Sequence, residues 1–168
     1  MCGIVGIFTS NSENSDRVLT ILKAMTKSLT HRGPDAEGLW TEGALAFGHR
    51  RLSIQDLSDA GAQPMHSESG RLVVAFNGEI YNHLDLRHEL EAENAAPVWR
   101  GHSDTETLLA GFAYWGLDKT LLRAKGMFAL ALWDRSEKKL YLARDRMGEK
   151  PLYWGWAGKE LVFGSELK

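Results

Sequence analysis

The grouping of apolar patterns along the chain is the feature of this sequence that most restricts its fold. Strand-like apolar runs stand at 3–8, 44–49, 72–77, 127–133, 140–143, 152–156 and 161–163. The last four runs read as two hairpins, and the helical spacing of apolar residues is concentrated between the strand-rich ends. Strands and helices that are grouped in this way do not match the strict alternation of a parallel doubly wound sheet. We therefore expect an α+β fold with antiparallel sheets.

Capping and turn signals set the boundaries of the predicted helices. The polar stretch 9–15 leads into a helix that turn residues at 31–35 bring to an end. The apolar stripe of this helix consists of Val18, Ile21, Leu22, Met25 and Leu29. Asn82 can cap a second helix, and Ser103 and Glu106 have the spacing of a capping box ahead of a third.

Charge and composition exclude several classes of protein. The 20 Lys and Arg residues nearly cancel the 22 Asp and Glu residues, so no basic excess points to nucleic acid or to a membrane surface. The opening apolar run is too short for a membrane span and lacks the basic lead-in of a signal peptide. We expect one domain over residues 1–168 and a cytoplasmic location.

Cys2 is the only cysteine of the chain, so it cannot form an internal disulfide or supply a multi-cysteine zinc site. Removal of Met1 would leave a thiol and a free α-amine on one residue. Ordinary pKa values of about 8 for the amine and about 8.5 for the thiol match a base to a nucleophile near neutral pH. The alternative is that Cys2 is a small buried apolar residue.

Eight short motifs, in this order, carry a resemblance to a known family. They are Cys2-Gly3-Ile4, the segments 31–35 and 49–54, Gln63-Pro64-Met65, the segment 77–82, Ser103-Asp104-Thr105-Glu106, Gly126-Met127-Phe128-Ala129, and Arg144-Asp145-Arg146 running to Lys150-Pro151-Leu152-Tyr153. Together they resemble the class II glutamine amidotransferase domain, and within that class the glutaminase half of asparagine synthetases.

The resemblance implies a fold and a domain organisation. The fold is that of the N-terminal nucleophile hydrolases, a four-layer α/β/β/α sandwich with two facing antiparallel sheets. Residues 1–168 would be the glutaminase domain, truncated at its C-terminal end, with the ATP-dependent synthetase domain absent. The resemblance implies that the glutaminase domain needs no cofactor, because ATP and Mg²⁺ serve only the missing domain. A homodimer is one assembly that we consider for this domain.

The resemblance also assigns the catalytic residues. Cys2 would attack the side-chain amide of L-glutamine and release ammonia, and water would then cleave the thioester to give L-glutamate. Asn77 and Gly78 would form the oxyanion hole through a side-chain amide and a backbone N–H. Asn-Gly is also a strong turn signal, so a hairpin turn at these two residues is an alternative or additional interpretation.

Charged residues would bind the two ends of the glutamine backbone. An arginine fork suits the α-carboxylate, and the sequence offers Arg50 and Arg51. Neighbours on an extended strand point to opposite sides, so only one of the two can face the site. The family motif selects Arg51 and leaves Arg50 on the surface. Asp104 and Glu79 would accept from the α-ammonium. A carboxylate at position 104 would also suit the first turn of the predicted helix for capping reasons alone.

The resemblance therefore implies a glutaminase that supplies ammonia for asparagine synthesis. We keep two alternative functions. One is an amidotransferase domain that serves another carboxylate acceptor such as a sugar acid, and the other is a catalytically silent interaction module. The six histidines show no metal-ligand spacing and are interpreted as loop and surface residues, so no metal site is expected. The motif 144–153 receives a structural or interdomain role.

Overall fold

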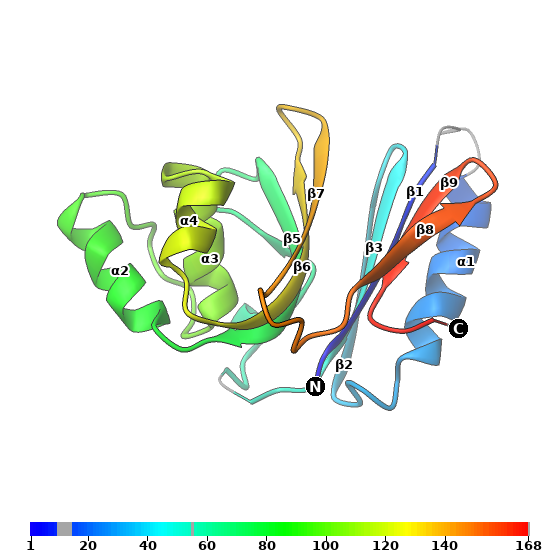
Figure 1. Cartoon of the computed structure of the whole chain (residues 1–168), viewed down its shortest axis with the longest axis horizontal. Helices are drawn as coiled ribbons and strands as arrows, with labels where there is room; N and C mark the ends of the chain where they lie inside the picture. The colour runs from blue at the N-terminus through cyan, green and yellow to red at the C-terminus, as the bar shows by residue number, and fades with distance from the viewer. Residues whose placement is uncertain (10–14, 55, 168) are drawn as a thin grey trace.

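The computed structural model describes residues 1–9, 15–54 and 56–167, and two antiparallel sheets lie face to face at its centre (Figure 1). The first sheet has the strand order β2-β3-β1-β9-β8, with β1 Gly3–Phe8, β2 Ala36–Glu42, β3 Leu45–Arg51, β8 Tyr153–Ala157 and β9 Glu160–Gly164. The second sheet has the order β4-β5-β6-β7, with β4 Met65–His66, β5 Leu72–Ile80, β6 Gly126–Asp134 and β7 Lys139–Arg144.

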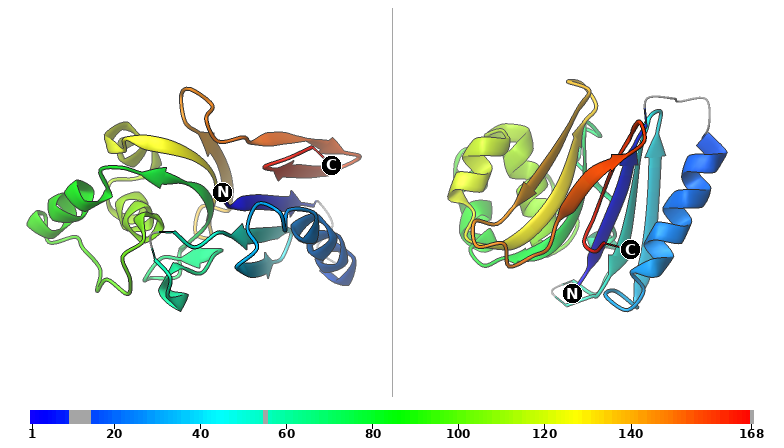
Figure 2. Two further views of the ribbon diagram at one scale, coloured as in Figure 1. Left: turned by 90° about the horizontal axis from the view of Figure 1, so that it is seen from below. Right: turned by 45° about the vertical axis from the view of Figure 1, so that its right-hand side comes forward.

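Helices cover the outer face of each sheet, as Figure 2 shows. Helix α1 (Ser15–Ser28) lies on the first sheet, and the second sheet carries α2 (His83–Ala92), α3 (Asp104–Tyr114) and α4 (Leu117–Arg123). A short 3₁₀ turn spans Asp59–Gly61. The predicted four-layer α/β/β/α sandwich is confirmed.

Alternation along the strands divides the apolar residues between separate cores. In β1, Ile4 faces the space between the sheets, where it clusters with Phe47 and Phe163, whereas Val5 faces Leu22 of α1. Successive side chains of a strand point to opposite faces, so one strand can serve both layers. The inner and outer cores are thus built from the same short sequence runs.

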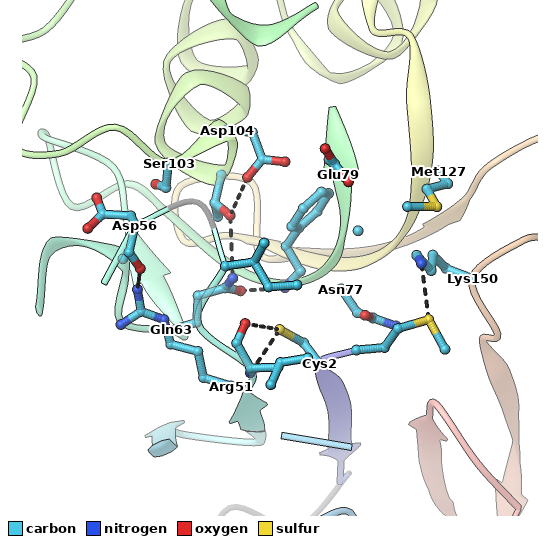
Figure 3. Close-up of a pocket in the computed structure, with 17 residues that line it drawn as sticks. Cys2, Arg51, Asp56, Gln63, Asn77, Glu79, Ser103, Asp104, Met127 and Lys150 are labelled. Atoms are coloured by element: carbon cyan, nitrogen blue, oxygen red, sulfur yellow. Dashed lines mark hydrogen bonds between the residues drawn. The ribbon is translucent and has the colours of Figure 1, made fainter. Parts of the chain in front are cut away.

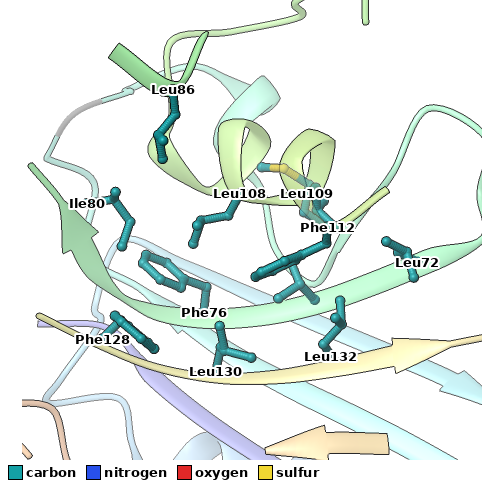
Figure 4. Packing of buried hydrophobic residues seen from close by; sticks show 12 residues of the cluster. Leu72, Phe76, Ile80, Leu86, Leu108, Leu109, Phe112, Phe128, Leu130 and Leu132 are labelled. Atoms are coloured by element: carbon teal, nitrogen blue, oxygen red, sulfur yellow. The ribbon is translucent and has the colours of Figure 1, made fainter. Parts of the chain in front are cut away.

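The largest outer core lies between the second sheet and its helices (Figure 4). Phe76 and Ile80 of β5 point toward Leu108 of α3 and Leu86 of α2, and all four are at most 2 % exposed. Burying side chains of this size contributes roughly 1.5–3 kcal/mol each. This packing fixes the end of β5 against the start of α3.

The sequence patterns missed β2, the two-residue strand β4, the 3₁₀ turn and α4. Strand β2 is an edge strand in which no residue is fully buried, and its sequence AEGLWTE lacks clear alternation. Helix α4 has seven residues and follows Gly116, whose φ of +84° suits glycine, and a helix this short offers little periodicity. The last two predicted hairpins are confirmed as the pairs β6–β7 and β8–β9.

Three local predictions need correction. Asn77 and Gly78 do not form a hairpin turn, because both lie inside β5 and pair with β6. Asn82 stands at the N-cap of α2, but its side chain bonds elsewhere, donating to the carbonyl of residue 123 and accepting from the N–H of residue 125. His49 is not a surface residue, since it is 1 % exposed within β3, and burial lowers its pKa to about 4.

The capping box of α3 is half formed. The side chain of Ser103 accepts from the N–H of Glu106, as expected for an N-cap. The carboxylate of Glu106 accepts instead from the N–H groups of Arg100 and Gly101, and so orders the loop before the helix.

Of the predicted polar stretch 9–15, residues 10–14 lie outside the described part of the chain.

Candidate active site

One cavity brings the sequence-predicted site residues together (Figure 3). It has a volume of about 150 Å³ and lies where the start of β1 faces the end of β5. Its lining includes all six predicted residues, Cys2, Arg51, Asn77, Gly78, Glu79 and Asp104. These residues come from both sheets and from the first turn of α3, so only the packing of the layers assembles them.

Cys2 directly precedes β1, and hydrogen bonds to Leu52 and Arg32 hold it in place. Its sulfur accepts a hydrogen bond from the N–H of Leu52 at 3.4 Å, and its carbonyl accepts from Nε of Arg32 at 3.1 Å. The residue is partly buried and its thiol is free of any disulfide. The thiol is therefore both fixed in position and open to the cavity.

Backbone N–H groups along one edge of β5 point toward the site. The N–H of Phe76 donates to Oε1 of Gln63 at 2.6 Å, and the N–H of Ile80 donates to Oδ2 of Asp104 at 2.8 Å. Alternate N–H groups of a strand point to the same edge, so the N–H of Gly78 lies between these two and faces the same way. Gly78 thus offers a fixed backbone donor to the cavity that it lines.

Asn77 supplies a second donor. The residue is 1 % exposed, and its Nδ2 has no hydrogen-bond acceptor among the described residues. Leaving a buried amide unsatisfied costs about 1–3 kcal/mol, so this N–H group is available to a ligand or a water molecule in the cavity. Odd-numbered β5 residues face the first sheet, as Val73 and Ala75 do in the inner core, and Asn77 therefore points toward the side that carries Cys2.

The strand register decides which arginine reaches the cavity. Gly3 pairs with Arg50 on the outer side, so Arg51 is on the inner side with Cys2. Arg51 donates to the carbonyl of Ser58 at 2.9 Å and to the carbonyl of Asp56, which orients the guanidinium. Arg50 instead donates to the carbonyl of residue 33 and to Glu37 at 3.1 Å, away from the cavity lining.

Two carboxylates face the opposite end of the site. Asp104 is 5 % exposed at the start of α3, and burial raises its pKa. Its Oδ2 accepts a hydrogen bond from the N–H of Ile80, and its Oδ1 lies 3.5 Å from the hydroxyl of Thr105. Glu79 lines the same wall from β5 and is partly exposed. A cation bound here would meet two acidic groups.

Asp56 lies between the loop that contacts Arg51 and the loop that precedes Asp104. The sequence patterns did not identify it as a site residue. Its carboxylate accepts from the N–H and hydroxyl of Ser58 at 2.8 and 2.6 Å, and from the N–H of His102 at 2.9 Å. The Ser58 bonds in particular lower the pKa of Asp56 to about 2. The residue thereby links the loop that orients Arg51 to the loop that begins α3 with Asp104.

Lys150 was also missed, because the motif 144–153 was given no role in the site. It is 6 % exposed, lines the cavity, and places Nζ 3.1 Å from Sδ of Met1 (Figure 3). A lysine in a predicted turn between strands reads as a solvated charge, so no local signal could have placed it here. Gln63 joins the site from a neighbouring loop, where Nε2 lies 3.4 Å from the hydroxyl of Thr105.

The described residues show neither a metal-binding cluster nor a membrane-spanning helix. Within residues 1–9, 15–54 and 56–167, no group of three or more His, Cys, Asp or Glu side chains could hold a metal ion. No described helix has the length and apolar character needed to cross a membrane.

Comparison with known proteins places this geometry in a family. The glutamine amidotransferase domain family matches residues 1–168. Asparagine synthetase [glutamine-hydrolyzing] 1 and 3 of Bacillus subtilis are 39 % and 38 % identical over 170 and 175 residues, covering 100 % of this chain and 26 % and 27 % of those proteins. The chain thus spans about a quarter of the length of these curated relatives.

A solved structure shows the same fold. Glutamine phosphoribosylpyrophosphate amidotransferase from B. subtilis superimposes with a TM-score of 0.78 at 24 % identity, covering 98 % of this chain and 42 % of that one. The N-terminal nucleophile fold expected from the sequence is thereby confirmed. With the family match extending over its whole length, the chain belongs to the glutamine amidotransferase domain family.

Proposed function

We propose that this chain is the glutamine-hydrolysing domain of an asparagine synthetase-like enzyme, and that it converts L-glutamine and water into L-glutamate and ammonia. One observation carries the proposal. A single cavity joins the only thiol of the chain to two oxyanion donors, an oriented guanidinium and a pair of carboxylates. These are the groups that an amino acid with a side-chain amide would need.

Recognition would use the two charged ends of the cavity. Arg51, held by two backbone carbonyls, keeps further N–H donors for the α-carboxylate of glutamine. Asp104 and Glu79 would accept from the α-ammonium. A ligand fixed at both ends presents its side-chain amide to Cys2, and this gives selectivity for the length of glutamine.

The chemistry would begin once Met1 has been removed. The α-amine of Cys2 takes the thiol proton, and the sulfur attacks the amide carbon. Nδ2 of Asn77 and the N–H of Gly78 bind the developing oxyanion. Collapse of the intermediate breaks the C–N bond, and the proton carried by the amine leaves with ammonia. Water then attacks the thioester carbon, which releases glutamate and restores the thiol.

The ammonia would serve a synthetase part of a longer protein. Relatives named asparagine synthetase extend well beyond the matched region, so we propose an ATP-using partner domain that activates aspartate. ATP and Mg²⁺ would belong to that domain, and the hydrolysis itself draws only on side-chain and backbone groups of this chain. We also propose a cytoplasmic location for this enzyme.

The test is ammonia release by protein whose intact mass shows that Met1 is absent. The unmodified chain should release ammonia from glutamine and should be labelled at Cys2 by a glutamine-mimicking electrophile. Cys2→Ala should do neither, and its thermal unfolding temperature should stay within a few degrees of the unmodified chain, because a partly buried thiol adds little packing. Ammonia release by Cys2→Ala would disprove the assignment. Labelling of Cys2 without turnover would favour the silent interaction module.

A further inference from the structure

Lys150 is a buried ammonium group that the proposed hydrolysis leaves without a role. It is 6 % exposed, and its Nζ contacts Sδ of Met1 at 3.1 Å. No carboxylate of the described residues lies within ion-pair distance of this nitrogen. Burying an ammonium without an ion-pair partner is costly, so a lysine in such a position calls for a functional explanation.

The loop that carries Lys150 is anchored firmly. The carboxylate of Asp145 accepts from the N–H groups of Phe128, Glu149 and Lys150 at 3.2, 2.9 and 3.0 Å. Gly148 turns the loop at a φ of +68°. These bonds tie the backbone of Lys150 to β6, and its ammonium is therefore directed into the cavity by a fixed support.

The remaining charges near the N-terminus already have partners. Arg51 and Lys150 are the cations among the described residues that line the cavity, and its acidic residues are Asp56, Glu79 and Asp104. Under the proposed function, Arg51 binds the α-carboxylate of glutamine, and Glu79 and Asp104 surround its α-ammonium. The carboxylate of Asp56 is engaged by Ser58 and His102.

A further cation lies beside the backbone of Cys2 but is neutralised. Arg32 donates to the carbonyl of Cys2, and it also pairs with Glu166 at 3.1 Å. Among the described charged residues that line the cavity or contact Cys2, Lys150 therefore has neither an acidic partner nor a ligand group assigned to it.

We propose that Lys150 is a positioning residue whose charge keeps the α-amine of processed Cys2 in its neutral, proton-accepting form. The inference rests on the proposed function, since it assumes that this amine is the base. Met1 is bonded directly to the Cys2 nitrogen, and its sulfur touches Nζ. Removal of Met1 would take away the side chain that contacts Nζ and would create the new α-amine one residue from that contact.

The physical effect is repulsion between like charges. An α-amine with an ordinary pKa of about 8 is only about one-tenth neutral at pH 7. A nearby cation disfavours the protonated amine, and lowering its pKa by about one unit would bring the neutral fraction to about one half. The gain in reactive base at pH 7 would thus be roughly fivefold.

A titration that does not depend on glutaminase activity tests this directly. In Met-trimmed Cys2→Ala protein, the N-terminal amine can be labelled by reductive ¹³C-methylation and titrated by NMR. We expect its pKa to be about one unit higher after Lys150→Met is added. Lys159→Met, which removes an exposed lysine in the β8–β9 turn, is the matched control and should change nothing. Equal pKa values with and without Lys150 would overturn the proposal.

The pH profile of the active enzyme gives the second readout. In Lys150→Met and Lys150→Gln, the acidic limb of kcat/KM should move about one unit upward, with activity recovered at higher pH, whereas Lys150→Arg should keep the original profile. A uniform loss at every pH would contradict the proposal and indicate oxyanion binding or structural support. Intact mass must show Met1 removal in each variant, because Lys150 contacts that residue. Failure of the glutaminase proposal would appear as no ammonia from any variant, while the NMR titration would still report on Lys150.

Discussion

The carboxylate of Asp104 accepts a hydrogen bond of 2.8 Å from the backbone N–H of Ile80. The bond joins the first residue of α3 to the last residue of β5, and it uses one oxygen of a side chain that also lines the cavity. Asp104 therefore combines a structural contact at the edge of the sheet with a charge facing the site. The two contributions can be separated by mutation.

Asp104→Asn should raise the KM for glutamine about 10- to 100-fold, the range expected for loss of a hydrogen bond to a charged group. The unfolding temperature should change little, because the amide oxygen of Asn can still accept from Ile80. Asp104→Ala should lose both the charge and this acceptor, and should lower the unfolding temperature as well. Steady-state kinetics and thermal unfolding of the two variants provide the measurement. Unchanged KM in Asp104→Asn would exclude the proposed ammonium contact.

Arg51→Lys should raise the KM for glutamine at least tenfold, because a lysine cannot reproduce the planar fork that binds a carboxylate with two parallel bonds. Arg50→Lys is the matched control, since its side chain bonds to residue 33 and to Glu37 outside the cavity lining. Its KM should stay close to that of the unmodified chain. Equal effects of the two substitutions would show that the register argument selects the wrong arginine.

Asn77→Ala should lower kcat about 10²- to 10³-fold, the usual effect of removing one oxyanion-hole donor. The KM should change much less, because the amide of Asn77 would bind mainly the charge that develops during attack. Binding of glutamine to the Cys2→Ala background, with and without Asn77→Ala, gives a control for ground-state binding. A large loss of ground-state binding would place Asn77 in substrate recognition instead.

Asp56→Asn should reduce stability at neutral pH, and the difference should vanish in acid. The pKa of Asp56 in the folded chain is about 2, below its ordinary value of 3.8, so ionised Asp56 stabilises the fold above about pH 4. The contribution, roughly 2 kcal/mol from this shift, should be lost as the pH falls from 4 toward 2. Urea unfolding of both proteins across this pH range measures it. A difference that stays constant with pH would assign the effect to packing alone, and the exposed Asp59→Asn serves as the control.

Local sequence patterns determined much of the architecture. The apolar run in β1, the capping serine of α3 and the two late hairpins follow from periodicity and turn chemistry, which depend on near neighbours in the chain. Alternation along a strand required only that one of Arg50 and Arg51 face the site, and the family motif selected Arg51. Family motifs added the identity of the site residues, which periodicity alone could not supply.

The tertiary structure decided what surrounds the thiol. Asn77 and Gly78 read as a turn, but pairing with β6 keeps them in a strand, and the side chains of Gln63 and Asp104 occupy the edge on either side of Gly78. Lys150 reaches the N-terminus across 149 positions of sequence. A local pattern records which face of an element is apolar, whereas a cavity depends on how distant faces pack together. That packing is a property of the assembled layers, and it alone placed the buried Lys150 against Met1 in the cavity that Cys2 lines.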